Sequence, residues 1–206
     1  MAKIETLFVT QLYRAEINGR GGAALVDELA QSCLYLAKED GAGRRWCKDN
    51  NYPGYTSYAS LTDLAMRLPP FAELTELIDG HIADFAKELD FDLGGRKLVM
   101  DSLWANVLDP GGHHAAHIHP QSVISGTFYA AVPEGASALK LEDPRLANMM
   151  AAPPRKSRAK LENRSFVYIA PKDGTLLLWE SWLRHEVPTN TAKAKRISIS
   201  FNYRWG

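Results

Sequence analysis

The sequence has few cysteines, no excess charge of either sign and no long run of apolar residues. Its 206 residues include two cysteines, Cys33 and Cys47, which are too few for a disulfide framework, and we expect both to be reduced, non-catalytic thiols. Basic and acidic residues both number 24, so charge gives no evidence for nucleic acid or an anionic membrane as a partner. Without the apolar run of a signal peptide or a membrane span, the sequence predicts a cytoplasmic protein.

Length and periodicity predict one domain with a helical first part and a β-rich second part. A chain of 206 residues suits a single domain, in which we expect residues 1–95 to be a helical support region and residues 96–206 to be the core. Apolar residues recur at helical spacing over 22–40, after a strand-like run at 7–9, and again over 70–89. These patterns predict two helices, the second of which packs against a sheet.

Two stretches are too irregular to predict helices. Residues 45–61 mix aromatic residues with Gly and Pro, and either line a substrate entrance or simply pack. Residues 145–163 predict a long excursion from the β-rich part, which is a candidate lid. The aromatic residues of the first stretch are Trp46, Tyr52, Tyr55 and Tyr58.

Short β-type runs separated by Pro, Gly, Asp or Asn dominate the chain after Gly95. Many short strands are typical of a sandwich or barrel. The runs are 97–107, 123–132, 138–141, 165–169, 175–179 and 196–203.

Histidines gather in this β-rich part. Because side chains alternate between the faces of an extended segment, His117 and His119 project to the same side about 7 Å apart and can share one metal ion. A third ligand must come from elsewhere, and His185, which follows a β-type run, is the best candidate. An isolated His-x-His pair is more often two surface imidazoles. Here turns at 111–112 and 171–174 favour the metal site.

A strand with one polar face follows His185. Arg196, Ser198 and Ser200 alternate with apolar residues, so they face the same side of the predicted strand. An arginine beside hydroxyl groups suits a bound carboxylate, since guanidinium can donate two parallel hydrogen bonds to it. The other interpretation is an ordinary surface arginine on a sheet.

Seven short motifs occur in an order typical of one enzyme superfamily. They are Trp104–Asn106, His117–Pro120, Ser125–Tyr129, Asp143–Arg145, Pro171–Trp179, His185–Pro188 and Arg196–Asn202. In this order the sequence resembles the 2-oxoglutarate- and iron(II)-dependent oxygenases, near their prolyl-4-hydroxylase-like branch. The resemblance implies a mainly β fold with α, namely a double-stranded β-helix (jelly-roll) buttressed by the N-terminal helices, and an oxidoreductase of the dioxygenase class that uses Fe(II) and 2-oxoglutarate.

The resemblance also implies roles for particular residues. His117 and His185 match two metal ligands of the superfamily, and Arg196 matches the basic residue that binds the distal carboxylate of 2-oxoglutarate. Tyr129 resembles a tyrosine that reaches the same carboxylate, and Ser198 lies on the same face as Arg196. Asn106 resembles an asparagine that holds the other end of the cosubstrate in the nucleic-acid demethylating members.

The sequence departs from the superfamily at the second ligand, where His119 replaces the usual carboxylate. Iron(II) normally takes two histidines and one carboxylate, so three neutral imidazoles leave the site more positive by one unit and alter its redox properties. Asp143 substitutes only if its loop folds back into the barrel mouth. His113 and His114 are interpreted as supporting or surface residues, and the alternative is a rearranged site in which one of them is a ligand.

Two rival hypotheses fit the same histidines. One is a zinc enzyme, because three histidines also suit catalytic zinc with an activated water. The other is a barrel that binds a metal or small ligand without catalysis. In the oxygenase hypothesis, the residues expected to enclose the pocket are Trp104, Phe128, Trp179 and Trp182.

Overall fold

The computed structural model describes residues 1–17, 22–145 and 150–206, and its main elements are ten strands and four helices within those residues. The helices are α1 Gly22–Glu39, α2 Gly41–Asp49, α3 Leu64–Arg67 and α4 Pro69–Glu88. The strands are β1 Tyr13–Glu16, β2 Gly54–Thr56, β3 Leu98–Leu108, β4 His114–His117, β5 Ile124–Ala131, β6 Leu139–Glu142, β7 Phe166–Ile169, β8 Thr175–Glu180, β9 His185–Val187 and β10 Arg196–Trp205.

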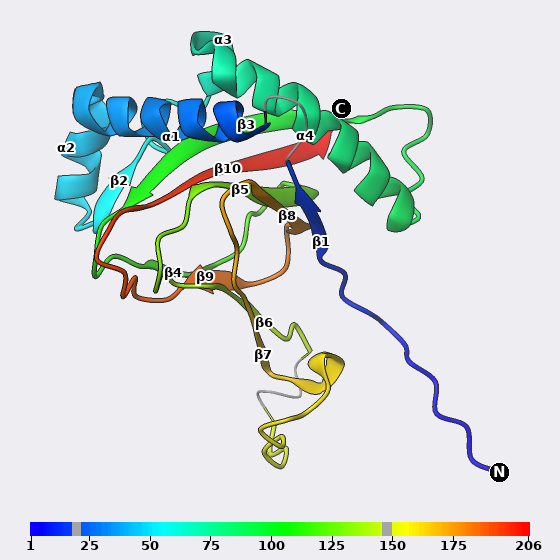
Figure 1. Ribbon diagram of the computed structural model, residues 1–206. Helices are drawn as coiled ribbons and strands as arrows, with labels where there is room; N and C mark the ends of the chain where they lie inside the picture. The colour runs from blue at the N-terminus through cyan, green and yellow to red at the C-terminus, as the bar shows by residue number, and fades with distance from the viewer. Residues whose placement is uncertain (18–21, 146–149) are drawn as a thin grey trace.

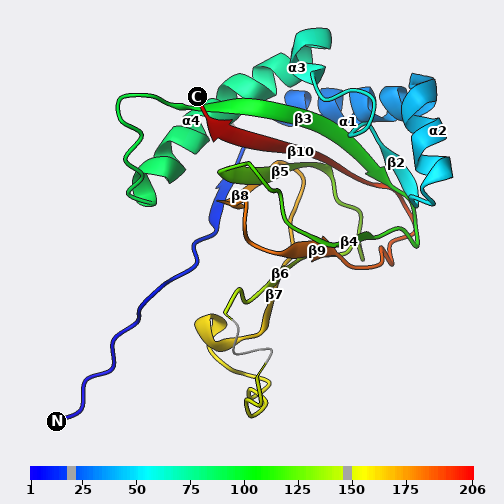
Figure 2. The same ribbon diagram turned by 180° about the vertical axis from the view of Figure 1, so that it is seen from behind.

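The strands form two antiparallel sheets. The larger sheet has the order β1-β8-β5-β10-β3-β2, and the smaller one has the order β4-β9-β6-β7. In Figure 1, α1 and α4 cover one face of the larger sheet, while the smaller sheet lies beyond its other face. The view from behind shows the same three layers (Figure 2). This arrangement confirms the predicted jelly-roll core with N-terminal helices buttressing one sheet.

The main core lies between the helices and the larger sheet. Its largest fully buried side chains include Phe71 and Phe85 from α4, and Phe128 and Phe201 from the strands below. The helical spacing of apolar residues in α1 and α4 produces this face, so both predicted helices are confirmed. A second, smaller apolar cluster lies on the other face of the larger sheet, around Trp179.

Two local predictions near the N-terminus are wrong. Residues 7–9 form no strand and their side chains are exposed, whereas the first strand is β1, which pairs with β8. Part of the stretch 45–61 is helical, because α2 runs to Asp49. The helix begins where the Asp40 side chain accepts a hydrogen bond from the backbone N–H of Gly43 at 2.9 Å.

The predicted β-type runs correspond to β3, β5, β6, β7, β8 and β10. The stretch 145–163 leaves the barrel between β6 and β7, as predicted, and its described part is largely exposed and irregular apart from a short 3-10 turn at Leu161–Asn163. Its residues 146–149 lie outside the described residues. A closing motion of this stretch stays a prediction.

Neither cysteine is paired with the other: Cys33 and Cys47 are both buried free thiols. Burial raises the pKa of both thiols, which keeps them protonated. Among the helices in the described part of the chain, none has the length and apolar character needed to span a membrane.

Candidate metal and cosubstrate site

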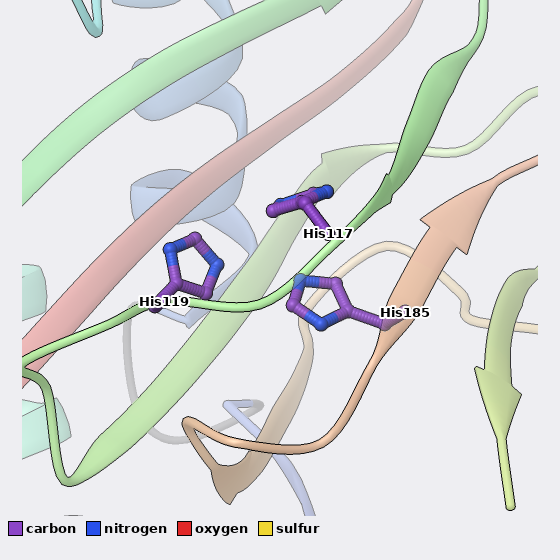
Figure 3. Close-up of side chains that lie close together, drawn as sticks. All are labelled: His117, His119 and His185. Atoms are coloured by element: carbon purple, nitrogen blue, oxygen red, sulfur yellow. The ribbon is translucent and has the colours of Figure 1, made fainter. Parts of the chain in front are cut away.

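Three histidines converge between the two sheets. His117 ends β4, His185 begins β9, and these two residues are direct partners in the pairing of the two strands. His119 follows β4, and its backbone N–H donates to Ser181 O at 3.1 Å. The potential ligand atoms of the three rings all lie within 4.8 Å of one another. Figure 3 shows the rings turned toward a common point.

Backbone carbonyls fix two of these rings. His117 Nδ1 lies 2.7 Å from Ala115 O, and His185 Nδ1 lies 2.8 Å from Leu183 O. A hydrogen bond to a carbonyl places the proton on Nδ1, which leaves Nε2 of each ring as a lone-pair donor. Histidines that bind a metal through one ring nitrogen commonly donate the N–H of the other nitrogen to a carbonyl in this way.

Burial keeps two of the three rings, those of His119 and His185, neutral. Desolvation, together with the neighbouring His117, lowers the pKa of His119 to about 4 and that of His185 to about 3. These two rings are therefore uncharged at neutral pH and ready to bind a cation, because only the neutral imidazole is a ligand. The donor set and its geometry fit a metal ion.

Arg196 lies in the same pocket and is buried, with 3% of its surface exposed. Its Nη1 donates to Ser198 Oγ at 3.4 Å, and its guanidinium carbon lies 4.9 Å from the centre of the Tyr129 ring. Within the described part of the chain, Nε and Nη2 of Arg196 and the hydroxyl of Tyr129 have no hydrogen-bond partner. Nε and Nη2 form one edge of the guanidinium, so the edge that holds a carboxylate in a fork is free.

Asn106 faces the pocket from β3 and is held by two neighbours. Its Oδ1 accepts a hydrogen bond from Thr56 Oγ1 at 2.8 Å, and its Nδ2 donates to Ser200 Oγ at 3.2 Å. Ser200 in turn lies 3.1 Å from Thr127 Oγ1. These contacts fix the orientation of the amide. Its N–H₂ group faces Ser200 on β10, and its carbonyl oxygen faces Thr56.

The pocket that contains these residues encloses about 530 Å³ of space outside protein atoms, including the part open to solvent. Of the four aromatic residues expected to enclose it, Trp104 and Trp179 line it. Phe128 does not, because the neighbouring Tyr129 faces the pocket and Phe128 faces the helix-side core. Trp182 is 45% exposed and lies outside the lining.

The remaining candidate residues differ in their position. His114 lines the pocket, and its ring centre lies 5.8 Å from that of His117, whereas His113 is exposed. Asp143 is ion-paired with Arg145 and is not part of the histidine cluster. The loop of Asp143 does not supply a carboxylate to the histidines in this structure.

One pocket residue has no sequence motif around it. Tyr52 lines the pocket from the segment between α2 and β2, far along the chain from the motifs of the β-rich part. The sequence signal was limited to the aromatic character of residues 45–61, which does not separate pocket residues from packing residues.

Residues 102–202 match a family model described as "Putative 2OG-Fe(II) oxygenase". Among solved structures, the chain is similar to a prolyl-4-hydroxylase from Pseudomonas putida, with 14% identity, a TM-score of 0.63 and coverage of 95% of this chain and 93% of that one. It is also similar to a prolyl hydroxylase from Trichoplax adhaerens, with 16% identity, a TM-score of 0.61 and coverage of 94% and 83%.

A third similar structure is HygX from Streptomyces hygroscopicus with nickel and 2-oxoglutarate bound, with 12% identity, a TM-score of 0.60 and coverage of 95% and 82%. No curated protein matches the sequence. At these identities the structural likeness establishes the fold, and the family model covers all three histidines and Arg196. By this match, the β-rich part of the chain, residues 102–202, is identified with the 2OG-Fe(II) oxygenase family.

Proposed function

We propose that the protein is an iron(II)- and 2-oxoglutarate-dependent oxygenase whose metal is held by His117, His119 and His185. The observation that carries this proposal is the combination of two features in one pocket. The ligand atoms of three imidazoles lie within 4.8 Å of one another, and a buried arginine, whose Nε and Nη2 have no hydrogen-bond partner among the described residues, lines the same cavity. A buried charge without a partner is costly, so the pocket suits an anionic ligand.

Arg196 and Tyr129 hold the distal carboxylate of 2-oxoglutarate in this proposal. The free edge of Arg196 donates two parallel hydrogen bonds, and the unpartnered Tyr129 hydroxyl donates a third. Ser198 supports the guanidinium through its contact with Nη1. Asn106, which is fixed by Thr56 and Ser200, offers an amide donor toward the other end of the cosubstrate.

When bound, iron(II) and 2-oxoglutarate supply the oxidation, in which the cosubstrate is decarboxylated to succinate and one oxygen atom is transferred to the substrate. The chain contributes orientation and exclusion of water. The carbonyls of Ala115 and Leu183 keep their histidines in one tautomer, and Trp104 and Trp179 form apolar walls. The reaction type is hydroxylation of a substrate whose class is still to be identified.

Charge balance supports a dianionic cosubstrate. The described residues that line the pocket include Arg196 but no aspartate or glutamate. A divalent metal on three neutral imidazoles therefore keeps its full charge, and a two-fold negative ligand offsets it. This electrostatic requirement is stronger here than in a site whose protein ligands already include a carboxylate.

The test measures succinate formation by protein that has been reconstituted anaerobically with iron(II), then supplied with 2-oxoglutarate and oxygen. We expect slow succinate formation without added substrate, complete dependence on His185, and a sharply raised 2-oxoglutarate requirement in Arg196→Ala with unchanged metal content. His113→Ala is the matched control, because that imidazole is exposed. Metal binding without any succinate would instead identify a non-catalytic metal-binding barrel.

The second candidate function is a zinc enzyme. Three histidines without a carboxylate, which is what the cluster contains, are also the ligands of catalytic zinc with a bound water. Elemental analysis of protein purified under anaerobic conditions separates the two functions. Stoichiometric zinc would favour the zinc enzyme if 2-oxoglutarate also leaves the metal content unchanged and no succinate is formed.

A further inference from the structure

Tyr52 has a hydroxyl that is buried and, among the described residues, has no hydrogen-bond partner. Its backbone N–H donates to Cys47 O at 2.8 Å, which holds the residue against the end of α2. Its ring is packed between Trp46, at 6.4 Å between ring centres, and His114, at 5.0 Å. The ring therefore contacts two aromatic neighbours, while the residue lines the pocket and its hydroxyl has no hydrogen-bond partner in the described part of the chain.

The register of the larger sheet places Tyr52 at the same end of the pocket as Arg196. Leu108 on β3 pairs with Arg196 on one side and with Gly54 on the other, and Tyr52 lies two residues before Gly54. Arg196, in β10, and Tyr52, in the segment that leads into β2, thus lie on either side of the same β3 residue. The positive charge of Arg196 also acts on the Tyr52 hydroxyl.

Two glycines, Gly54 and Gly112, allow the segment that contains Tyr52 to lie close to β3. Gly54 has φ 129°, and a Cβ there would overlap the carbonyl of Val107. A Cβ on Gly112 would lie 2.6 Å from Pro53 O and 2.8 Å from the Leu108 side chain. Larger residues at these positions would push the Tyr52 segment away from β3.

We propose that Tyr52 is a third residue of the distal-carboxylate site, which donates a hydrogen bond to that carboxylate of 2-oxoglutarate beside Arg196 and Tyr129. The inference rests on the proposed function. Burial, more than any other influence, raises the pKa of Tyr52, so the hydroxyl keeps its proton and acts as a donor. The residue lies outside the segment 102–202, so the N-terminal part of the chain completes the anion site.

The experiment compares two ligands on manganese(II)-loaded protein by calorimetric titration without oxygen. 2-Oxoglutarate has both the 2-oxo acid end and the distal carboxylate, whereas 2-oxobutanoate has the same 2-oxo acid end without that carboxylate. Because a hydrogen bond to a charged group is strong, we expect Tyr52→Phe to weaken 2-oxoglutarate binding by about ten-fold or more. Binding of 2-oxobutanoate should be unchanged.

Tyr58→Phe is the matched control, since Tyr58 is in the same region but 53% exposed and outside the pocket lining. The inference is overturned if Tyr52→Phe binds 2-oxoglutarate like the wild type, or if both ligands weaken equally. Arg196→Ala separates this result from a failure of the proposed function. If Arg196→Ala also binds 2-oxoglutarate like the wild type, the carboxylate site itself is wrong and the Tyr52 inference falls with it.

Discussion

Strand β10 separates two interiors of opposite character. On the helix side, Ile197, Ile199 and Phe201 belong to a large apolar core, whereas on the other side Arg196 and Ser198 line the pocket. Both sets are buried, and they alternate along the same strand. The difference between the two faces is therefore one of partners and not of solvent access.

The helix-side core contains apolar groups in contact with one another, which stabilises the fold in proportion to the area removed from water. The pocket side keeps polar atoms at Arg196, Tyr129 and Trp179 that have no hydrogen-bond partner among residues 1–17, 22–145 and 150–206. Such atoms cost stability, so their retention points to ligand binding. Substitutions on the two faces should therefore change the free energy of unfolding by different amounts and in opposite directions.

Phe201→Ala should have the largest effect on stability. The side chain is fully buried between the larger sheet and the helices, so its removal leaves a cavity and should lower the free energy of unfolding by about 3 to 5 kcal/mol. Urea denaturation of the metal-free protein measures this change. Ser200→Ala, on the opposite face of the strand, is the control and should change the free energy of unfolding far less.

Gly126→Ala should have the second largest effect. A Cβ at this position would overlap the Phe201 ring and lie 2.7 Å from the Leu178 side chain, so the core must shift, at a cost of about 1 to 3 kcal/mol. Thermal unfolding measures it. Gly80→Ala is the control, because a Cβ there meets nothing within 4 Å and should stabilise α4 by about 0.5 to 1 kcal/mol.

Arg196→Met should not lower the free energy of unfolding, in contrast to the two substitutions in the helix-side core. The substitution replaces a buried guanidinium that has no ion-pair partner in the described part of the chain with an apolar side chain of similar length. We expect the free energy of unfolding of the metal-free protein to stay the same or to rise by about 1 kcal/mol. A clear loss of stability in denaturant titration would show that the arginine is structural.

A fall of one pH unit below pH 6.5 should have the smallest effect, and on the pocket side it should act through His185. His185 has a folded pKa of about 3, mainly because of burial, against 6.5 for the free side chain. The unfolded state therefore binds the proton first, so stability is full above pH 6.5 and falls as the pH drops toward the folded pKa. The slope per histidine is at most about 1.4 kcal/mol per pH unit. In metal-free His185→Gln, the decline should be shallower.

The sequence predicted the parts of the site that depend on strand periodicity. Alternation placed Arg196 and Ser198 on one face, and the His-x-His spacing brought His117 and His119 together, because both signals lie within a few residues. The structure also places His185 beside His117. That these residues bind iron(II) and 2-oxoglutarate stays a prediction, which the experiments above test.

The sequence did not predict the shortest elements or the contacts between segments that are far apart in the chain. Strand β1 has four residues and gains its structure from β8, and α2 has nine residues, so neither carries a strong periodic signal. The pocket role of Tyr52 depends on pairing of β2 with β3, which no local pattern reveals. Phe128 was wrongly assigned to the pocket, because the sequence did not show which face of β5 meets the helices.

The pairing of β1 with β8 has a consequence for biosynthesis. Glu16 and Thr175, which are 159 positions apart, meet through a side-chain hydrogen bond at this edge of the larger sheet. During translation the first strand stays unpaired until the 159 positions that separate Glu16 from Thr175 have been synthesised and β8 has left the ribosome. Such distant contacts slow folding, so nascent chains of this protein should depend on chaperone protection until β8 emerges.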